Sequence, residues 1–220
     1  ITVRGQKFLR EADVVIYAGS LVNPELLKET KPGCEILNSA YMTLDEVIRA
    51  MEKAEREGNM TVRLHTGDPA IYGAIREQMD AMDRLGISYD ICPGVSSFCG
   101  AAAALGMEYT LPGVSQSVVI TRMAGRTPVP DRESVSCFAA HGATMVVFLS
   151  AGLLDGLQRE LLDGGYKPST PAAIVYKATW PEEKTVICRL DQLADTAGRE
   201  GISKTALVIV GDSVSQAGYD

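Results

Sequence analysis

The feature that most constrains this chain is a regular alternation of short apolar runs with longer segments of helical spacing. Turns of a few residues separate them, as where "MTVRLH" meets "TGDP" at Thr66. This alternation is typical of a mostly parallel sheet with helices on its faces. Helices are expected over 3–12, 23–30, 43–58, 74–86 and 93–106, and strands over 14–17, 34–38, 60–65 and 88–92.

Several helix ends carry capping residues. Asn23 precedes Pro24, which suits the N-cap and first position of a helix. Thr43 and Glu46 have the spacing of a capping box, and Gly58 marks the end of the same helix. Asp68 is expected to cap a helix that starts at Pro69, because Gly67 permits the sharp turn that precedes it.

The pattern restarts after a turn-rich stretch, "GMEYTLPGVSQS", which suits a linker. We therefore expect two α/β domains, 1–112 and 113–220. Strands are expected in "SVVITR", "TMVVFLS", "AAIVYKATWP", "KTVICRL" and "TALVIVGDS". The short gap between the third and fourth of these predicts an antiparallel pair, so the second sheet should be mixed.

Composition excludes several classes of protein. The formal net charge of −7 argues against nucleic acid as a partner, since phosphate binding requires a basic surface. The five cysteines are odd in number and lack a C-x-x-C pair, so we expect no zinc site or disulfide framework and a reducing cytoplasm. No apolar run approaches the roughly 20 residues of a membrane span, and no signal segment opens the chain, so no membrane association is expected.

Two turns at predicted strand ends are candidate ligand sites, because sheets of this kind bind ligands there. Gly67 either permits the turn or leaves its backbone bare for a ligand. Ser96 and Ser97 open a helix of small residues, which suits either close helix packing or a ligand carboxylate at free N–H groups. His65 and His141 have no partners at metal-ligand spacing, so both are expected to be structural and no metal site is predicted.

Cys99 is expected to be a buried small side chain, and no G-x-S-x-G nucleophile or phosphate-binding Gly-Lys loop occurs. Arg122, Arg126 and Lys177 have two interpretations. They either face solvent, or they line a cleft that holds an anionic, aromatic ligand beside Trp180.

Six stretches in this order, which together span nearly the whole chain, resemble the tetrapyrrole methylases, enzymes of corrin and sirohaem synthesis that use S-adenosylmethionine. The stretches are "HTGDPAIYGAI", "PGVSSFCGAAAALG", "YTLPGVSQSVVITR", "GRTPVP", "VVFLSAG" and "IVYKATWPEEK". "GRTPVP" and "YKATWPEEK" favour the branch that methylates ring carbon 11 of a precorrin over uroporphyrinogen or precorrin-2 methylases. Another tetrapyrrole step, or a non-catalytic tetrapyrrole-binding module, is the alternative.

The resemblance implies a homodimer with its active site in the cleft between two α/β domains, where S-adenosylmethionine lies folded. It implies donor-binding residues at Thr66, Gly67, Asp68, Ile71, Ser96, Ser97, Leu149, Ser150, Ala178, Thr205 and Ala206. It implies tetrapyrrole-binding residues at Tyr17, Ser20, Tyr72, Arg122 and Arg126. The family opens with a strand and a Gly-Pro-Gly-rich turn, which the resemblance places ahead of Ile1.

The expected chemistry explains why no nucleophile or metal motif is needed. The sulfonium donor is already activated, so aligning sulfur, methyl and ring carbon supplies much of the rate, up to roughly 7–11 kcal/mol in the best intramolecular cases. No general base is assigned. A basic cleft on an acidic protein suits a substrate with many carboxylates, because local fields outweigh net charge.

Overall fold

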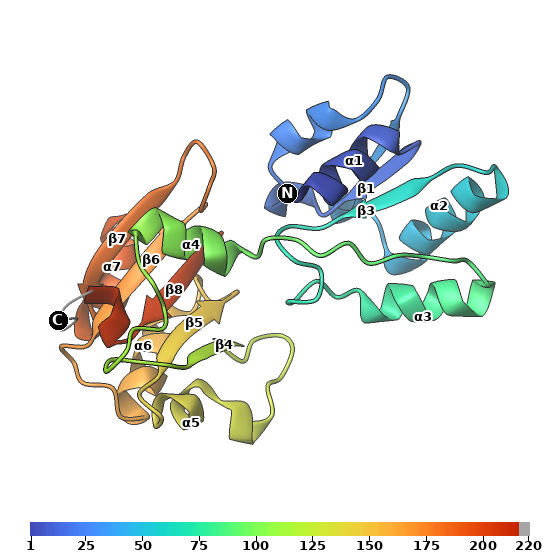
Figure 1. Cartoon of the computed structure of the whole chain (residues 1–220). Coiled ribbons are helices and arrows are strands. Elements are labelled where there is room, and N and C mark those ends of the chain that lie inside the picture. The colour runs from blue at the N-terminus through green and yellow to red at the C-terminus, as the bar shows by residue number, and fades with distance from the viewer. Residues whose placement is uncertain (216–220) are drawn as a thin grey trace. The chain divides into compact units, whose positions relative to one another are not determined.

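The structure is a computed structural model, and it describes residues 1–215 (Figure 1). The chain divides into two compact units, of which the first is Ile1–Ser97 and the second begins at Phe98. The predicted boundary, after residue 112, lies further along the chain. Small-residue helix α4 (Ser97–Leu105) thus belongs almost entirely to the second unit.

The first unit has a parallel three-stranded sheet in the order β2-β1-β3, which confirms the predicted sheet type. Its strands are β1 (Val14–Tyr17), β2 (Glu35–Asn38) and β3 (Thr61–Leu64). Its helices are α1 (Val3–Glu11), α2 (Leu44–Arg56) and α3 (Arg76–Leu85). The central strand is buried on both faces, because Val15 packs with Leu9 of α1 while Ile16 packs with Val47 of α2.

The capping-box prediction for this unit is confirmed. Thr43 accepts from the Glu46 amide, and the Glu46 carboxylate accepts from the Thr43 amide at 2.7 Å. Gly86 ends α3 in the left-handed conformation, with φ of 66°. Asn23 does cap the segment that follows it, but that segment is a 3₁₀ helix, Pro24–Glu29, rather than an α-helix.

Two predictions for this unit are wrong. No helix starts at Pro69, because residues 69–72 form a turn, residues 73–75 are irregular and α3 begins at Arg76. The expected strand at 88–92 runs as irregular chain. Within residues 1–215, the outer edge of β3 is unpaired, and this segment forms no ladder with it.

The second unit has a mixed sheet in the order β4-β5-β8-β6-β7. Its strands are β4 (Val118–Arg122), β5 (Thr144–Phe148), β6 (Pro171–Tyr176), β7 (Lys184–Arg189) and β8 (Ala206–Val210). After α4, its helices are α5 (Val135–Ala139), α6 (Leu154–Asp163) and α7 (Leu193–Arg199). β6 and β7 are antiparallel as predicted, and β5, in the sheet interior, is buried along its whole length.

The core of this unit packs the sheet against α6 and α7, with Leu157, Leu161 and Leu193 fully buried. Cys99 on α4 is exposed, which corrects its predicted burial. All five cysteines are free. Among the described residues, no helix has both the length and the apolar character that a bilayer crossing requires.

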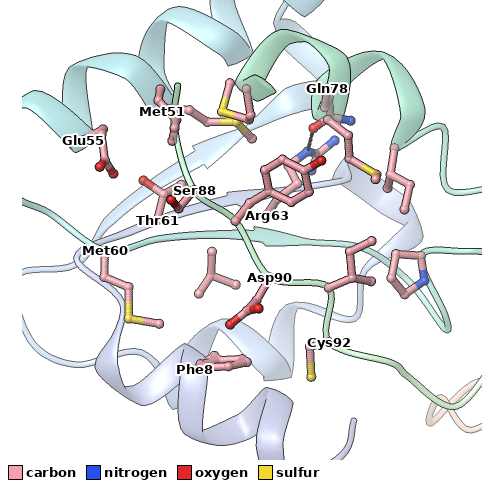
Figure 2. A pocket seen from close by; sticks show the side chains of 18 of the residues that line it. Phe8, Met51, Glu55, Met60, Thr61, Arg63, Gln78, Ser88, Asp90 and Cys92 are labelled. Atoms are coloured by element: carbon pink, nitrogen blue, oxygen red, sulfur yellow. Dashed lines mark hydrogen bonds between the residues drawn. The ribbon is translucent and has the colours of Figure 1, made fainter. Parts of the chain in front are cut away.

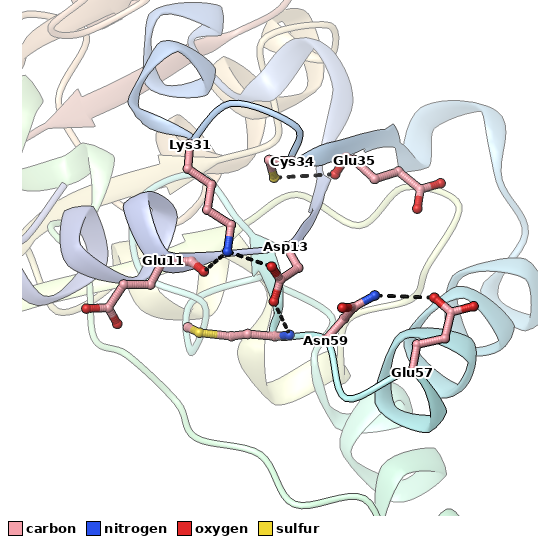
Figure 3. A network of polar contacts seen from close by, with 8 residues as sticks. Glu11, Asp13, Lys31, Cys34, Glu35, Glu57 and Asn59 are labelled. Carbon is pink, nitrogen blue, oxygen red and sulfur yellow. Dashed lines mark hydrogen bonds and ion pairs between the residues drawn. The ribbon is translucent and has the colours of Figure 1, made fainter.

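A polar network fixes the start of the first sheet (Figure 3). Asp13, just before β1, accepts from Lys31 Nζ at 2.5 Å and from the Met60 amide at 2.8 Å. Lys31 also donates to the Glu11 carbonyl at 3.0 Å. The Lys31 ammonium and the Met60 amide hold the pKa of Asp13 below its ordinary value. One carboxylate thereby ties together the segments that lead into all three strands.

Candidate functional site

The parallel first sheet brings the ends of its strands to one edge. Tyr17, Asn38 and Leu64 are the last residues of β1, β2 and β3 and are matched in register. Ser39, just past β2, donates to the Tyr17 carbonyl at 2.9 Å. The turns that follow these strands therefore lie side by side, which is where open α/β sheets bind ligands.

Asp68 joins the two predicted donor-binding turns of the first unit. Its Oδ1 accepts from the Ala70 amide at 2.8 Å, and its Oδ2 accepts from the Gly94 amide at 2.9 Å. The first bond closes the turn after β3, and the second reaches the turn that leads to Ser96. Asp68 thus replaces the predicted helix cap with a bridge between two loops.

Glycines allow the backbones of these two turns to touch. A Cβ on Gly67, whose φ is 61°, would lie 3.2 Å from Ser96 Cα and 3.3 Å from the Ser97 nitrogen. A Cβ on Gly94 would overlap the Gly67 carbonyl, 2.9 Å from its carbon atom. A side chain at either position would force the loops apart, so the requirement for glycine is steric at both positions and also conformational at Gly67.

The remaining predicted donor-binding residues of the first unit lie in the same two turns. Thr66 is exposed and Ile71 is half-buried in the turn after β3. Ser96 is buried, and Ser97 begins α4. The structure therefore brings Thr66, Gly67, Asp68, Ile71, Ser96 and Ser97 together in two adjacent turns.

The second sheet also collects its predicted residues at one edge, although its strands are mixed. β4 and β5 are parallel, so Arg122 and Phe148 end level with each other. β8 is antiparallel to β5 and β6, so its first residue, Ala206, lies at the same edge, opposite Tyr176. The loops after β4, β5 and β6 and the turn before β8 therefore share this edge.

Ser150 organises that edge through a buried hydroxyl. Its Oγ donates to the Phe148 carbonyl at 2.7 Å and accepts from the Met123 amide at 2.9 Å. It thereby links the end of β5 to the end of β4. The neighbouring Leu149 is 65% exposed and has a φ of 52°. Ser150 itself is fully buried, so its hydroxyl fixes this edge from beneath the surface.

Strained backbone is concentrated in the two sets of loops. Six non-glycine residues of the described chain have positive φ: Tyr72, Ala74, Leu149, Lys177, Thr179 and Thr205. Two lie in the turn after β3, and the other four flank the strands at the edge of the second sheet. Residues in this conformation persist only where surrounding contacts enforce it, and they cluster at functional sites.

The predicted tetrapyrrole-binding residues are divided between the units. Tyr17, Ser20 and Tyr72 are in the first unit, where Tyr17 ends β1 and the other two are exposed. Arg122 donates to the carbonyls of Met123, Thr127 and Pro128 at 3.0–3.1 Å. Its guanidinium therefore holds its own loop, and the exposed Arg126 lies within that loop.

The first unit also contains a cavity of about 400 Å³ along the open edge of β3 (Figure 2). Its lining is largely apolar, with Phe8, Met51 and Met79 among the side chains, and Arg63 is its one cation. Arg63 donates to Gln78, the Ile16 carbonyl and Ser39. This cavity therefore has no uncommitted cation for a polycarboxylate ligand.

His65 lies at the end of the same cavity. Burial and the nearby Arg63 charge lower the pKa of His65 to about 4, so its imidazole is neutral at pH 7.

Sequence reasoning did not assign a role to Gly94 or Gly73. Gly73 lies against Pro69 so closely that a Cβ would be 2.8 Å from the Pro69 carbonyl carbon. The second glycine of "GDPAIYG" and the Pro-Gly pair that ends "DICPG" were the available signals.

Comparison with known proteins shows which family the chain belongs to. The family model of the tetrapyrrole (corrin/porphyrin) methylases matches residues 1–194. A cobalt-precorrin-4 C(11)-methyltransferase of Methanocaldococcus jannaschii is 51% identical over 100% of this chain and 85% of its own length. The precorrin-4 C(11)-methyltransferase of Mycobacterium tuberculosis is 42% identical over 100% of this chain and 88% of its own.

Two solved structures are similar to this chain over nearly its whole length. The X-ray structure of a cobalt precorrin-4 methyltransferase, described as a cobalamin biosynthetic enzyme, has a TM-score of 0.94 at 46% identity and covers 97% of this chain and 90% of its own. A uroporphyrin-III C-methyltransferase from Thermus thermophilus, complexed with S-adenosyl homocysteine, has a TM-score of 0.82 at 28% identity and covers 98% and 93%. The chain described here belongs to the tetrapyrrole (corrin/porphyrin) methylases.

Proposed function

We propose that this protein transfers a methyl group from S-adenosylmethionine to ring carbon 11 of cobalt-precorrin-4, in cobalamin biosynthesis. The observation that carries the proposal is full-length similarity, at 42–51% identity, to relatives named for that carbon. The two most similar of these, at 51% and 47%, are named for the cobalt form, and the relative at 42% for precorrin-4. The cobalt complex is therefore the proposed substrate.

The donor residues we propose are those that the sequence predicted at the two sheet edges. The backbones of Gly67 and Ser96 touch because Gly67 has no side chain, and two turns packed this closely suit a flat nucleoside held near the main chain. Asp68 would hold these two turns rigid. Thr66, Ile71, Ser97, Leu149, Ser150, Ala178, Thr205 and Ala206 complete the proposed donor set.

The protein's contribution to the reaction would be orientation. The donor supplies an activated methyl group, and its transfer to carbon needs an in-line approach. Loops whose strained backbones are fixed by hydrogen bonds lose little further entropy when they bind, so they can hold such an alignment. Arg126, presented by the loop that Arg122 holds, is the proposed contact to a substrate carboxylate, with Tyr17, Ser20 and Tyr72 as further contacts.

A methyl-transfer assay tests the proposal. Purified protein would be incubated with radiolabelled S-adenosylmethionine and either precorrin-4 or its cobalt complex. Label should enter the cobalt complex faster, and the product's NMR spectrum should place it at carbon 11. Binding of S-adenosylhomocysteine without turnover of either tetrapyrrole would contradict the enzymatic role and favour a binding module. Faster turnover of metal-free precorrin-4 would reverse the choice of substrate.

Oligomeric state and location are also proposals. We propose a homodimer in the cytoplasm, on the likeness to the family and the five free cysteines. Light scattering coupled to size-exclusion chromatography should give twice the mass of one chain. A single-chain mass at micromolar concentration would contradict the dimer.

A further inference from the structure

The loop between β6 and β7 holds an unusual amount of strain. Lys177 has a φ of 46° and Thr179 a φ of 70°. A β-branched residue is a genuine outlier in this region, because its side chain crowds the backbone. Ala178, a proposed donor contact, lies between these two residues, so its position depends on whatever holds them.

Several contacts pin this loop from within the second unit. The Lys177 amide donates to the Thr205 carbonyl at 2.9 Å, and its ammonium lies 4.9 Å from the centre of the Trp180 ring and 3.3 Å from Glu182. The Thr179 amide donates to the Glu183 carboxylate at 2.5 Å. Both strained residues therefore have their backbone amides fixed by hydrogen bonds. The loop cannot easily shift away from a segment that packs against it.

That segment is α4, at Gly100. A Cβ at Gly100 would lie 3.1 Å from Thr179 Cγ2 and 3.6 Å from Ala178 Cβ. The first distance is tighter than ordinary carbon contacts of about 3.5–4.0 Å. The same helix begins at Ser97, directly after Ser96, in the second proposed donor turn.

We propose that Gly100 is a positioning residue of the methyltransferase. Its missing side chain lets α4 lie against the pinned loop, and this contact sets where Ala178 meets the donor. Gly100 itself touches neither donor nor tetrapyrrole in this proposal. The inference rests on the proposed function and adds a residue that neither the sequence patterns nor the donor turns had assigned.

Four variants test the contact. Gly100→Ala adds the clashing methyl group. Gly198→Ala on α7 is the matched control, because a Cβ there meets nothing within 4 Å. Gly100→Ala combined with Thr179→Ser removes the Thr179 methyl that the new Cβ would strike, and Thr179→Ser alone completes the mutant cycle. Each is measured by titration with S-adenosylhomocysteine, by thermal unfolding without ligand, and by the KM values for donor and tetrapyrrole.

Gly100→Ala should weaken S-adenosylhomocysteine binding on the order of tenfold and raise the donor KM, because misplacement by a fraction of an ångström is costly. The tetrapyrrole KM should stay unchanged, Gly198→Ala should bind like the parent, and the double variant should recover most of the affinity. Unchanged binding by Gly100→Ala, or equal loss in the double variant, would overturn the inference.

The ligand-free unfolding experiment separates this inference from the proposed function. Non-additive unfolding temperatures of the two single variants and the double variant would show that Gly100 and Thr179 are coupled, whatever the protein binds. If the parent failed to bind S-adenosylhomocysteine, the proposed function would fail while this coupling remained measurable. If the parent bound and the effects were additive, only the positioning role would fail.

Discussion

Asp68 offers the sharpest test of how the proposed donor-binding turns are built. Its carboxylate accepts one backbone hydrogen bond within its own turn, from Ala70, and one from Gly94 in the other turn. A hydrogen bond to a charged group contributes about 1.5–3 kcal/mol net. The bond to Gly94 is partly buried and is the only one of the two that crosses between turns. Its loss should therefore cost about 1.5–2 kcal/mol of loop stability.

Asp68→Asn and Asp68→Ala distinguish this bridge from a direct ligand contact. The amide of Asn keeps one acceptor oxygen, so it can satisfy Ala70 or Gly94 but not both. Hydrogen exchange of the Gly94 amide should accelerate about 10- to 30-fold in Asp68→Ala without ligand, which is the factor that corresponds to 1.5–2 kcal/mol. Asp68→Asn should fall between Asp68→Ala and the parent, and both variants should bind S-adenosylhomocysteine more weakly.

The exposed Asp163→Asn, at the end of α6 in the second unit, controls for loss of one charge. It should leave Gly94 exchange and ligand binding at the parent values. Parent-like protection of the Gly94 amide in Asp68→Ala would refute the bridge. Weakened ligand binding with unchanged exchange would instead make Asp68 a direct contact.

Three further outcomes are expected. Between pH 6.5 and 4 the unfolded chain protonates His65 while the folded chain does not, so the free energy of unfolding should fall by up to ~3 kcal/mol as pH drops. Urea titrations should show a smaller fall in His65→Gln. Thr43→Ala removes one half of the capping box with Glu46 and should cost about 1 kcal/mol by the same titration. Asp13→Asn should lower the free energy of unfolding near pH 7, and its difference from the parent should disappear as pH falls through the lowered pKa of Asp13. A difference that does not change with pH would contradict the ion pair with Lys31.

The fold was largely predictable because its elements carry local signals. The capping box at Thr43 and the terminal glycine at Gly86 act within a few residues, so sequence spacing alone reveals them. The segment 88–92 has strand composition but no partner strand among residues 1–215. Whether such a segment joins a sheet is decided by its neighbours, and its own sequence does not encode them.

The site was predictable as segments but not as interactions. Asp68 was expected to cap a helix, because Asp before Pro is a common helix start. Its carboxylate instead accepts a hydrogen bond from the Gly94 amide, 26 positions away, and no local sequence pattern predicts such a bond. Ser150 was assigned to the donor by likeness, whereas its hydroxyl bridges Phe148 and Met123. Likeness indicated which segments form the candidate site, and only tertiary structure gives the atoms that interact within it.

Strain at these edges predicts a conflict between stability and activity. Each non-glycine residue with positive φ costs about 1–2 kcal/mol, so six of them cost an amount comparable with a domain's net stability of 5–15 kcal/mol. Burial of Leu149 offsets little of this conformational cost, because the residue is 65% exposed. Leu149→Gly should therefore raise the free energy of unfolding by about 1 kcal/mol.

The same substitution should weaken S-adenosylhomocysteine binding, because a glycine at this position frees the backbone that the strain keeps in one conformation. Leu153→Gly is the matched control, since Leu153 is also exposed but has a φ of −128°. It relieves no strain, so it should only destabilise the protein. If Leu149→Gly both stabilised the protein and bound as tightly as the parent, the strained backbone at the end of β5 would serve no purpose in donor binding.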